Sequence, residues 1–288
     1  MAVIDTGTLD KEIIALLPQV FTAKSFLSKS GAGDVSRDVN TLYRNDPGFV
    51  HAIDENDNKP IVPISWTSYE LQKKTLVGYT DRITKRQLKT QEGQQIARDL
   101  VAGLARTIPA AADVLTLAGV NPGDGTPLTV DSIESSTTLK VYQGTDSLLS
   151  VLDAAKAALP LATRGVMAVP AYGELANLRA EMTGQYIFPN ASPDNFQYGT
   201  ATVIVSPQVS WPGKEGVGTE SNRLAVFGDF SVVRRAIDGI DIEWFNTGNP
   251  DGGANDLGRK NQYVARVETD YYWVITKANA FSVAYSGT

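Results

Sequence analysis

Oxygen-bearing side chains crowd together at residues 54–58, where the sequence reads Asp-Glu-Asn-Asp-Asn. Oxygen atoms at alternate positions are the ligands that a calcium-binding loop offers its ion. The remainder of that pattern is absent, because Lys59 stands where such a loop needs glycine and Ser65 stands where it needs a closing bidentate acid. We therefore interpret the stretch as the solvated tip of a loop and predict no metal site.

Two glycine-containing turns are the next candidates for chemistry. A phosphate-binding loop needs a Lys-Ser or Lys-Thr pair and follows a strand, whereas segment 119–125 lacks the pair and follows a helical pattern. The Gly-Asp-Phe triplet at 228–230 has a different residue order from the magnesium-binding triplet of kinases. We interpret both as structural turns, in which Gly228 adopts a positive φ and Asp229 caps neighbouring backbone amides.

Side chains suited to proton transfer are scarce. His51 is the single histidine and cysteine is absent, which excludes thiol nucleophiles, iron–sulfur clusters and any site with two histidines. No serine lies in a Gly-x-Ser-x-Gly elbow. Asp238 and Asp241 leave a carboxylate-dependent hydrolase open, since two carboxylates suffice for glycoside hydrolysis. Their position in a turn favours solvated side chains, so we predict that the chain is not an enzyme and needs no cofactor.

Length and charge narrow the classes of protein further. A chain of 288 residues can bury a substantial core in one large domain or two connected ones. Lys and Arg total 26 against 32 Asp and Glu, a net charge of -6, so no strong positive field would attract a phosphate backbone. The N-terminus lacks a signal-peptide pattern, and we expect no stretch of roughly 20 apolar residues that could span a membrane.

Hydrophobic spacing predicts the elements that position these residues. Apolar residues at steps of four or eight from Leu88 to Ile108 indicate a helix from about 84 to 118, with Pro109 expected to kink or end it. Further helices are expected at 147–159 and 171–182. Strands are expected at 165–169, 202–205, 224–227 and 240–245, and within the aromatic and β-branched run 263–285.

The first 75 residues have a different character from the rest. Residues 1–45 are polar except for one apolar cluster, which fits a short amphipathic helix on an arm that lies against something else: Ile13, Ile14, Leu16, Leu17, Val20 and Phe21. From Phe49 to Ile64 the pattern predicts a long hairpin with a polar tip. Prolines near its returning limb favour an edge or isolated hairpin, because proline cannot donate to a central ladder.

The order of motifs in the second half resembles a known family. An Ala-Val-Phe-Gly-Asp-Phe run at 225–230 precedes a strand and the sequence Asp-Gly-Ile-Asp-Ile at 238–242. A strand bearing Arg266 follows, and then Ala-Asn-Ala-Phe at 278–281. Each motif alone occurs by chance, whereas their number, order and spacing together are informative. The chain resembles the major capsid proteins of tailed bacteriophages, which have the Hong Kong 97 type of capsid fold.

This resemblance implies an α+β fold whose parts follow a set order along nearly the whole chain. It assigns an N-terminal arm to 1–45, an extended β-hairpin loop to 46–75, a peripheral domain with a spine helix at about 84–118 to 76–127 and 241–288, and an axial domain with a mixed central sheet to 128–240.

The function that the resemblance implies is self-assembly. Hexamers and pentamers of identical subunits would tile an icosahedral phage head that encloses double-stranded DNA without sequence-specific binding and contacts no membrane. The expected place of the protein is the virion capsid, assembled in the host cytoplasm, with a portal and scaffolding or decoration proteins as partners. Because the chain starts at Met1 without a scaffold-like domain ahead of the arm, we expect a separate scaffolding protein or none.

An encapsulin, a bacterial compartment of the same fold that holds a cargo enzyme, is the nearest alternative. Neighbouring terminase, portal and protease genes would favour the phage, and a neighbouring peroxidase or ferritin-like gene would favour the compartment. A carboxylate-dependent hydrolase is the remote alternative and predicts a small monodisperse protein with an acidic pocket.

Four residues are candidates for contacts between subunits. Asp54 and Lys59 stand at the predicted loop tip, and Trp66 and Trp211 stand next to loops, where an interface and a core position are equally compatible with the pattern. Lys59 is also the candidate lysine for the covalent crosslink that some relatives form. Its asparagine partner stays open among Asn255, Asn261 and Asn279.

The remaining tryptophans, Trp244 and Trp273, lie in dense strand patterns and are predicted to belong to the core.

Overall fold

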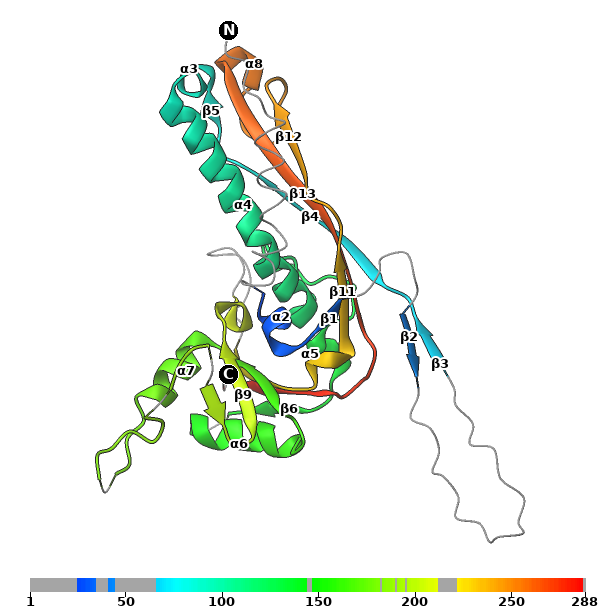
Figure 1. Cartoon of the computed structure of the whole chain (residues 1–288), viewed down its shortest axis with the longest axis vertical. Helices are drawn as coiled ribbons and strands as arrows, with labels where there is room; N and C mark the ends of the chain where they lie inside the picture. The colour runs from blue at the N-terminus through cyan, green and yellow to red at the C-terminus, as the bar shows by residue number, and fades with distance from the viewer. Residues whose placement is uncertain are drawn as a thin grey trace, which may run out of the picture.

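The computed structural model describes residues 25–34, 41–44, 66–143, 147–181, 183–189, 191–194, 196–211 and 222–286. The predicted amphipathic helix around Ile13 to Phe21, the hairpin tip 54–59 with His51, and the loop that follows Trp211 lie outside these residues. Figure 1 shows an elongated molecule, with one sheet and a long helix in the upper half and a second sheet with shorter helices below.

The upper sheet is built around β13 (Gln262–Ile275), a 14-residue strand rich in aromatic and β-branched residues. Along one edge β13 pairs with β4 (Gln72–Tyr79), and along its other edge it pairs with β11 (Val233–Ile237) and then β12 (Asp241–Phe245), all antiparallel. Two short strands complete it: β1 (Gly33–Asp34), parallel to β11, and β5 (Ile83–Thr84), which pairs with the start of β13.

The long helix α4 (Gln91–Ala118) packs against this sheet. The sequence predicted one helix from about residue 84, whereas the structure has a separate turn, α3 (Lys85–Leu88), and then α4 with Thr90 as its N-cap. The junction requires glycine, because a Cβ on Gly93 would overlap the carbonyl oxygen of Gln87. The prediction of an unbroken start is therefore wrong.

Pro109 does not end α4, which continues to Ala118 and stops at Gly119 with φ of 67°. Proline removes one intrahelical hydrogen bond. Packing of the next turns compensates, because Ala112 and Leu115 are buried against Tyr271 and Trp273 of β13.

By length and composition α4 could cross a membrane, although we expected no such stretch. Of its most apolar window, 56% is buried inside the protein. That degree of burial against a sheet is typical of the core helix of a folded domain.

The lower sheet has six strands and is mixed, as predicted. Its order is β6 (Lys140–Tyr142), β14 (Phe281–Tyr285), β10 (Arg223–Gly228), β7 (Arg164–Met167), β9 (Ala201–Val205) and β8 (Phe196–Tyr198). The pairs β6–β14 and β7–β9 are parallel and the others antiparallel.

Helices cover this sheet and close its core. The predicted helix at 147–159 is confirmed as α6 (Leu148–Ala158), which Ser147 caps. The helix predicted at 171–182 is shorter, because α7 (Val169–Ala176) ends where the Asn177 side chain turns back to donate to the Gly173 carbonyl. Short helical turns complete the chain: α5 (Ile133–Ser136), η1 (Pro207–Ser210), η2 (Phe230–Val232) and α8 (Leu257–Lys260).

Sheet membership departs from the predicted domain bounds at three places. β14 was placed with the 241–288 segment, but it pairs with β10 and β6 in the lower sheet. β11 was placed in 128–240, but it pairs with β13 in the upper sheet. β4 begins inside the range predicted for the extended loop and belongs to the upper sheet. Each of these strands joins its sheet by pairing with a strand that is distant in the sequence. The hydrophobic pattern within one strand does not reveal which partner it will have.

Gly228 does not have the positive φ that its turn predicted. Glycine is required there by close approach instead, because a Cβ would lie 2.5 Å from the Ala280 carbonyl oxygen and 3.0 Å from Phe281 Cα. The second half of the prediction is confirmed, since Asp229 Oδ1 accepts from the Ser231 amide at 3.0 Å.

Residues 25–34 are part of the core, which corrects the prediction that the whole N-terminal region is an arm with its apolar residues satisfied elsewhere. The helix α2 (Phe26–Ser30) buries Phe26 and Leu27 to 2% and 0% exposure in the cluster that fills the lower sheet. Ser25 caps α2, and Gly31 ends it with a positive φ.

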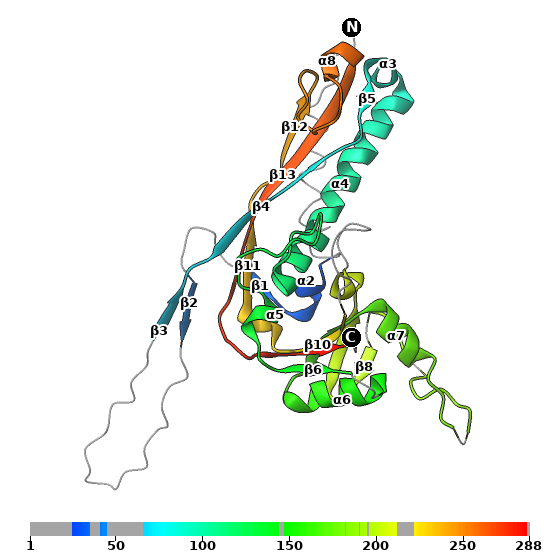
Figure 2. The same ribbon diagram turned by 180° about the vertical axis from the view of Figure 1, so that it is seen from behind.

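One ribbon stands away from the body. It consists of β2 (Thr41–Arg44) and β3 (Trp66–Tyr69), paired antiparallel, and β4 continues from it into the upper sheet. Figures 1 and 2 show this ribbon projecting to one side of the molecule from both directions.

Candidate assembly surfaces

The predicted contact residues do not form a single site. Asp54 and Lys59 lie outside the described residues. Trp66 lies at the start of β3 on the projecting ribbon, where its Cα is paired with that of Arg44. Trp211 follows η1 on the body, is 37% exposed, and donates its indole N–H to the Pro122 carbonyl at 3.1 Å. Of the two candidate tryptophans, Trp66 therefore stands on strand β3 of the ribbon and Trp211 follows η1 on the body.

The projecting ribbon is the first of these surfaces. A two-stranded ribbon alone is marginally stable in water. β2 and β3 pair with each other and with no other described strand. Contacts with something outside the body would stabilise such a ribbon.

The free edge of β4 is the second surface. The Thr80 amide donates to the Ala265 carbonyl at 2.9 Å, so residue 80 faces β13. Because alternate residues of an antiparallel strand direct their backbone groups to opposite edges, those of Lys73, Thr75, Val77 and Tyr79 face away from β13. Among the described strands, β13 is the only partner of β4. Unpaired backbone groups of this kind are a template for another strand.

Two large apolar side chains of β4 are exposed along this edge. Val77 is 56% exposed and Tyr79 is 37% exposed. Lys73 beside them forms an ion pair with Asp270 at 2.6 Å, and the carboxylate raises the pKa of Lys73. The edge therefore combines open hydrogen-bonding groups and apolar surface with an ion pair beside them.

A groove between β4 and α4 is the third surface. Its volume is about 750 Å³, and the described residues of its wall include the cationic Lys74 and Arg106 and no carboxylate. Trp211 is among the residues that line it. The apolar wall is formed chiefly by Leu76, Leu104, Ile108, Ala111 and Leu128.

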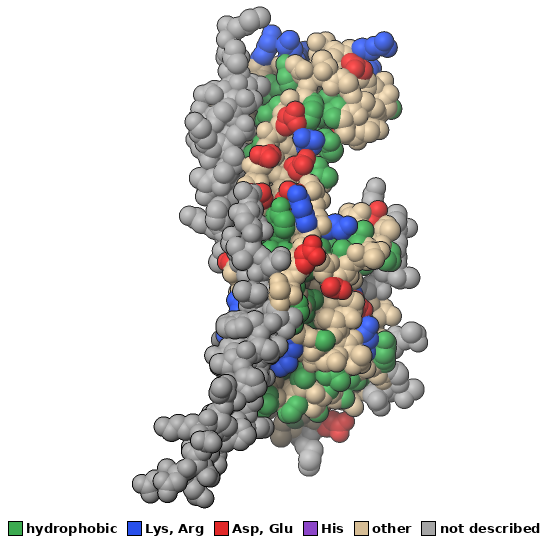
Figure 3. All heavy atoms as spheres, turned by 90° about the vertical axis from the view of Figure 1, so that its right-hand side faces the viewer, with side chains coloured by type: hydrophobic (Ala, Val, Ile, Leu, Met, Phe, Trp, Pro, Cys, Tyr) green, Lys and Arg blue, Asp and Glu red, His purple; other side chains and the backbone are tan. Residues whose placement is uncertain are grey.

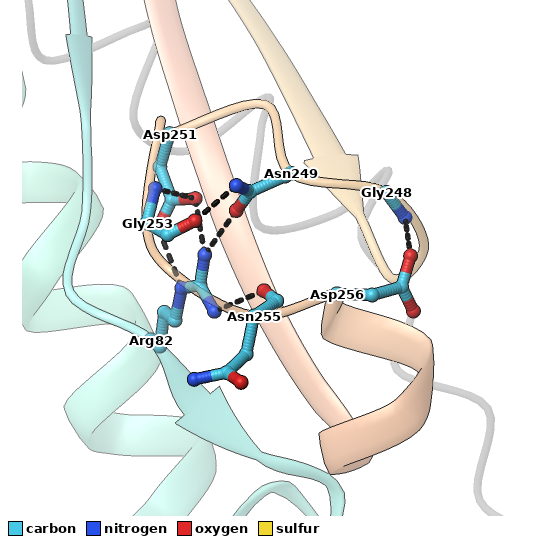
Figure 4. A network of polar contacts seen from close by, with 7 residues as sticks. All are labelled: Arg82, Gly248, Asn249, Asp251, Gly253, Asn255 and Asp256. Atoms are coloured by element: carbon cyan, nitrogen blue, oxygen red, sulfur yellow. Dashed lines mark hydrogen bonds and ion pairs between the residues drawn. The ribbon is translucent and has the colours of Figure 1, made fainter.

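A single guanidinium shapes the loop that links β12 to α8 at the upper end of the molecule (Figure 4). Arg82 donates to both carboxylate oxygens of Asp251, at 2.7 and 2.6 Å, to the Asn255 carbonyl at 2.7 Å and to Asn249 Oδ1 at 2.6 Å. This pairing lowers the pKa of the Asp251 carboxyl to about 2. Asp256 next to it caps α8 through the Arg259 amide.

A buried polar group ties α2 to the long helix. Asp113 of α4 accepts from Ser25 Oγ at 2.7 Å and from the Phe26 amide at 2.6 Å. Arg235 of β11, which is 4% exposed, donates to Ser25 Oγ at 2.7 Å and also to Ser28 Oγ. Burial raises the pKa of the Asp113 carboxyl to about 7, although the hydrogen bonds and Arg235 oppose the shift.

The predicted hydrolase pair, Asp238 and Asp241, lies at or near the surface. Asp241 is exposed and Asp238 half-buried, and neither lines the groove or the smaller hollow of about 480 Å³ beside α6. Within the described part of the chain, no group of three His, Asp or Glu residues could hold a metal ion. On the described part of the face in Figure 3, acidic and basic side chains lie interspersed.

Comparison with solved structures gives the fold a known counterpart. A chain of Mycobacterium phage Ogopogo aligns with TM-score 0.72 and 22% identity over 92% of both chains. The capsid of Myoviridae phage XM1 aligns with TM-score 0.55 and 15% identity, and the capsid of an empty GTA particle aligns with TM-score 0.52 and 13% identity, each over 91% of both chains. This chain has a phage capsid fold. No protein-family model and no curated protein matches the sequence.

The capsid fold predicted from the motif order is thereby confirmed, and it includes the long helix and the mixed sheet. Sequence reasoning missed the polar anchors of this capsid fold. Asp113 gave a signal, since it is a lone acid in the apolar stretch from Ile108 to Leu117, whereas Arg82 stood in no recognisable pattern.

Proposed function

We propose that this chain is the major capsid protein of a tailed phage and self-assembles into the icosahedral shell of the head. The observation that carries the proposal is the extent of the likeness, because capsid chains of phage XM1 and of the GTA particle match over 91% of both chains. An arrangement shared from end to end supports a shared role in a shell. That role is structural and requires no catalytic site.

Each part of the subunit would have its own role in the shell. The upper sheet with α4 would be the peripheral domain and form the long edge of the subunit. The lower mixed sheet would be the axial domain and surround the local axes of hexamers and pentamers. The β2–β3 ribbon would begin the extended loop and reach over a neighbour, which agrees with its position away from the body.

The contents and partners of the shell follow from the same role. The shell would enclose double-stranded DNA without sequence-specific binding, which agrees with the net charge of -6. A portal and scaffolding or decoration proteins would complete the head, assembled in the host cytoplasm. Asp54, Lys59, Trp66 and Trp211 are proposed as contacts between subunits, Trp211 because it is exposed beside the groove.

Expression of the chain followed by sedimentation and negative-stain electron microscopy tests this function. The expected result is a homogeneous population of hollow particles that sediment far faster than a 31.0 kDa subunit. A stable monomer, both alone and with the candidate scaffolding protein from the neighbouring genes, would contradict the proposal.

A further inference from the structure

The chemistry of the groove between β4 and α4 favours one kind of occupant. Among the described residues its wall is largely apolar, and the charged ones, Lys74 and Arg106, are both cations. An apolar segment that carries carboxylates would match this wall in both respects, because it would bury apolar surface and place its acids beside fixed positive charges.

A segment of that composition immediately precedes the described residues. Before Lys24 the sequence has three acids, Asp5, Asp10 and Glu12, against the single Lys11. It also has apolar residues at the spacing of one helix face, the pattern by which a helix binds a groove, namely Ile13, Ile14, Leu16 and Leu17, with Val20 and Phe21 beyond Pro18, which ends or kinks the helix.

The position of Ser25 brings this segment within reach of the groove. Ser25 Oγ donates to Asp113, which lies on the same turns of α4 as Ala111 and Val114 of the groove wall. The four steps from Phe21 to Ser25 span about 13 Å when extended. Successive residues of a helix lie about 100° apart around its axis, so Val114 is separated from Asp113 by an arc of about 9 Å on a helix about 10 Å in diameter, which the four extended residues can cover.

We propose that residues 10–21 bind in the groove between β4 and α4 of their own chain. Their apolar side chains lie against Leu76, Leu104 and Ile108, and Asp10 and Glu12 lie near Lys74 and Arg106. The same chain is favoured over a second copy because the tether holds the segment near the groove at an effective concentration in the millimolar range. The inference concerns the isolated subunit and stands apart from shell assembly.

Site-specific crosslinking tests the proposal, and the absence of natural cysteine makes every introduced thiol unique. The double variant Leu17→Cys with Ala111→Cys places one thiol in the segment and one on the groove wall. The control, Leu17→Cys with Ala102→Cys, places the second thiol on a half-buried residue of α4 outside the groove. A short bismaleimide is expected to crosslink the first pair with several-fold higher yield than the second.

Mass spectrometry of a mixture of isotopically light and heavy chains identifies the partner. Crosslinked peptides of one isotope only are the expected result. A yield no greater than that of the control would overturn the proposal, and so would crosslinks that join light and heavy peptides, because they would place the segment on a second copy.

A single substitution gives a second measurement that does not depend on the cysteine variants. Leu17→Asp puts a charge among the apolar residues and is expected to release the segment. Amide hydrogen exchange at Leu104 to Leu115 should then increase several-fold, with no change in β10 of the lower sheet. Unchanged exchange along the groove would show that the segment does not bind there.

Discussion

Asp113 and Asp251 are both carboxylates with a shifted pKa, and the two shifts have opposite signs for opposite physical reasons. Asp113 is fully buried, so loss of hydration penalises its charged form and raises its pKa to about 7. Asp251 is held by the bidentate Arg82 guanidinium, which favours the charged form and lowers the pKa to about 2. One side chain anchors α2 inside the molecule and the other shapes an outer loop.

Asp113 should make the subunit less stable as pH rises from about 4 to about 7. In that window the folded state holds a proton that the unfolded state, with a carboxyl pKa near 3.8, has released. The free energy of unfolding should therefore fall with pH, by on the order of 3 kcal/mol. Urea unfolding at several pH values measures it, and Asp113→Asn should remove most of this dependence. An equal slope in the variant would contradict the assignment.

Arg82→Lys should loosen the loop from Gly248 to Asp256, because an ammonium cannot reproduce the bidentate pairing or reach the Asn249 and Asn255 oxygens together. Amide exchange in this loop is expected to rise while that of β14 stays constant. The pairing with Asp251 is present above the ordinary carboxyl pKa and is lost as pH falls toward about 2. Near pH 2, the amide hydrogens of this loop should therefore exchange at the same rate in the natural protein and in the variant.

At the scale of elements, the fold requires a glycine where a neighbouring backbone lies too close to leave room for a Cβ atom. Gly228 ends β10 against the backbone of Ala280 and Phe281, and this contact brings the turn beside β14. A Cβ added to Gly173 in α7 would meet no heavy atom within 4 Å. Gly228 and Gly173 both stand between an aromatic residue and an acid in the sequence, but only Gly228 lacks the space for a methyl group.

Gly228→Ala should destabilise the subunit by about 1–3 kcal/mol, because the backbone atoms that the methyl group meets cannot rotate away. Gly173→Ala is the matched control and should stabilise α7 by about 0.5–1 kcal/mol, since alanine is the better helix former. Thermal unfolding of both variants measures the difference. Equal effects would contradict the close-approach argument.

Local elements were predictable where the hydrophobic period is strong, as for α6 and β10, and the motif order was enough for the fold. The placement of β11 and β14 was not predictable, because each joins a sheet through strands far away in the sequence. The same holds for Ser25 and Asp113, whose hydrogen bond joins residues 88 positions apart. Of the candidate contact residues, sequence could mark aromatic side chains near loops, but it could not place them on particular surfaces.

At the scale of the whole molecule, exposed apolar surface on an open strand edge must be covered or it becomes a site of uncontrolled association. β4 has such an edge, with Val77 as its most exposed large residue. In the proposed shell, a neighbour would cover it.

Val77→Lys should therefore reduce particle formation strongly while leaving the melting temperature of the subunit nearly unchanged, because the side chain is 56% exposed. Val77→Thr keeps the β-branched shape and should still assemble. Sedimentation and electron microscopy measure assembly. Normal particles from the lysine variant would remove the β4 edge from the proposed contacts.

The pairing of β4 with β13 also bears on how the protein is made. Gln72 pairs with Trp273, and Tyr79 pairs with Arg266, so β4 leaves the ribosome long before its partner has been translated. The whole lower sheet except β14 is synthesised in the interval. Until β13 emerges, α4 has no completed sheet to pack against, and a nascent chain cannot present the long edge of a finished subunit. Translation itself would thus delay lattice formation until each subunit is nearly complete.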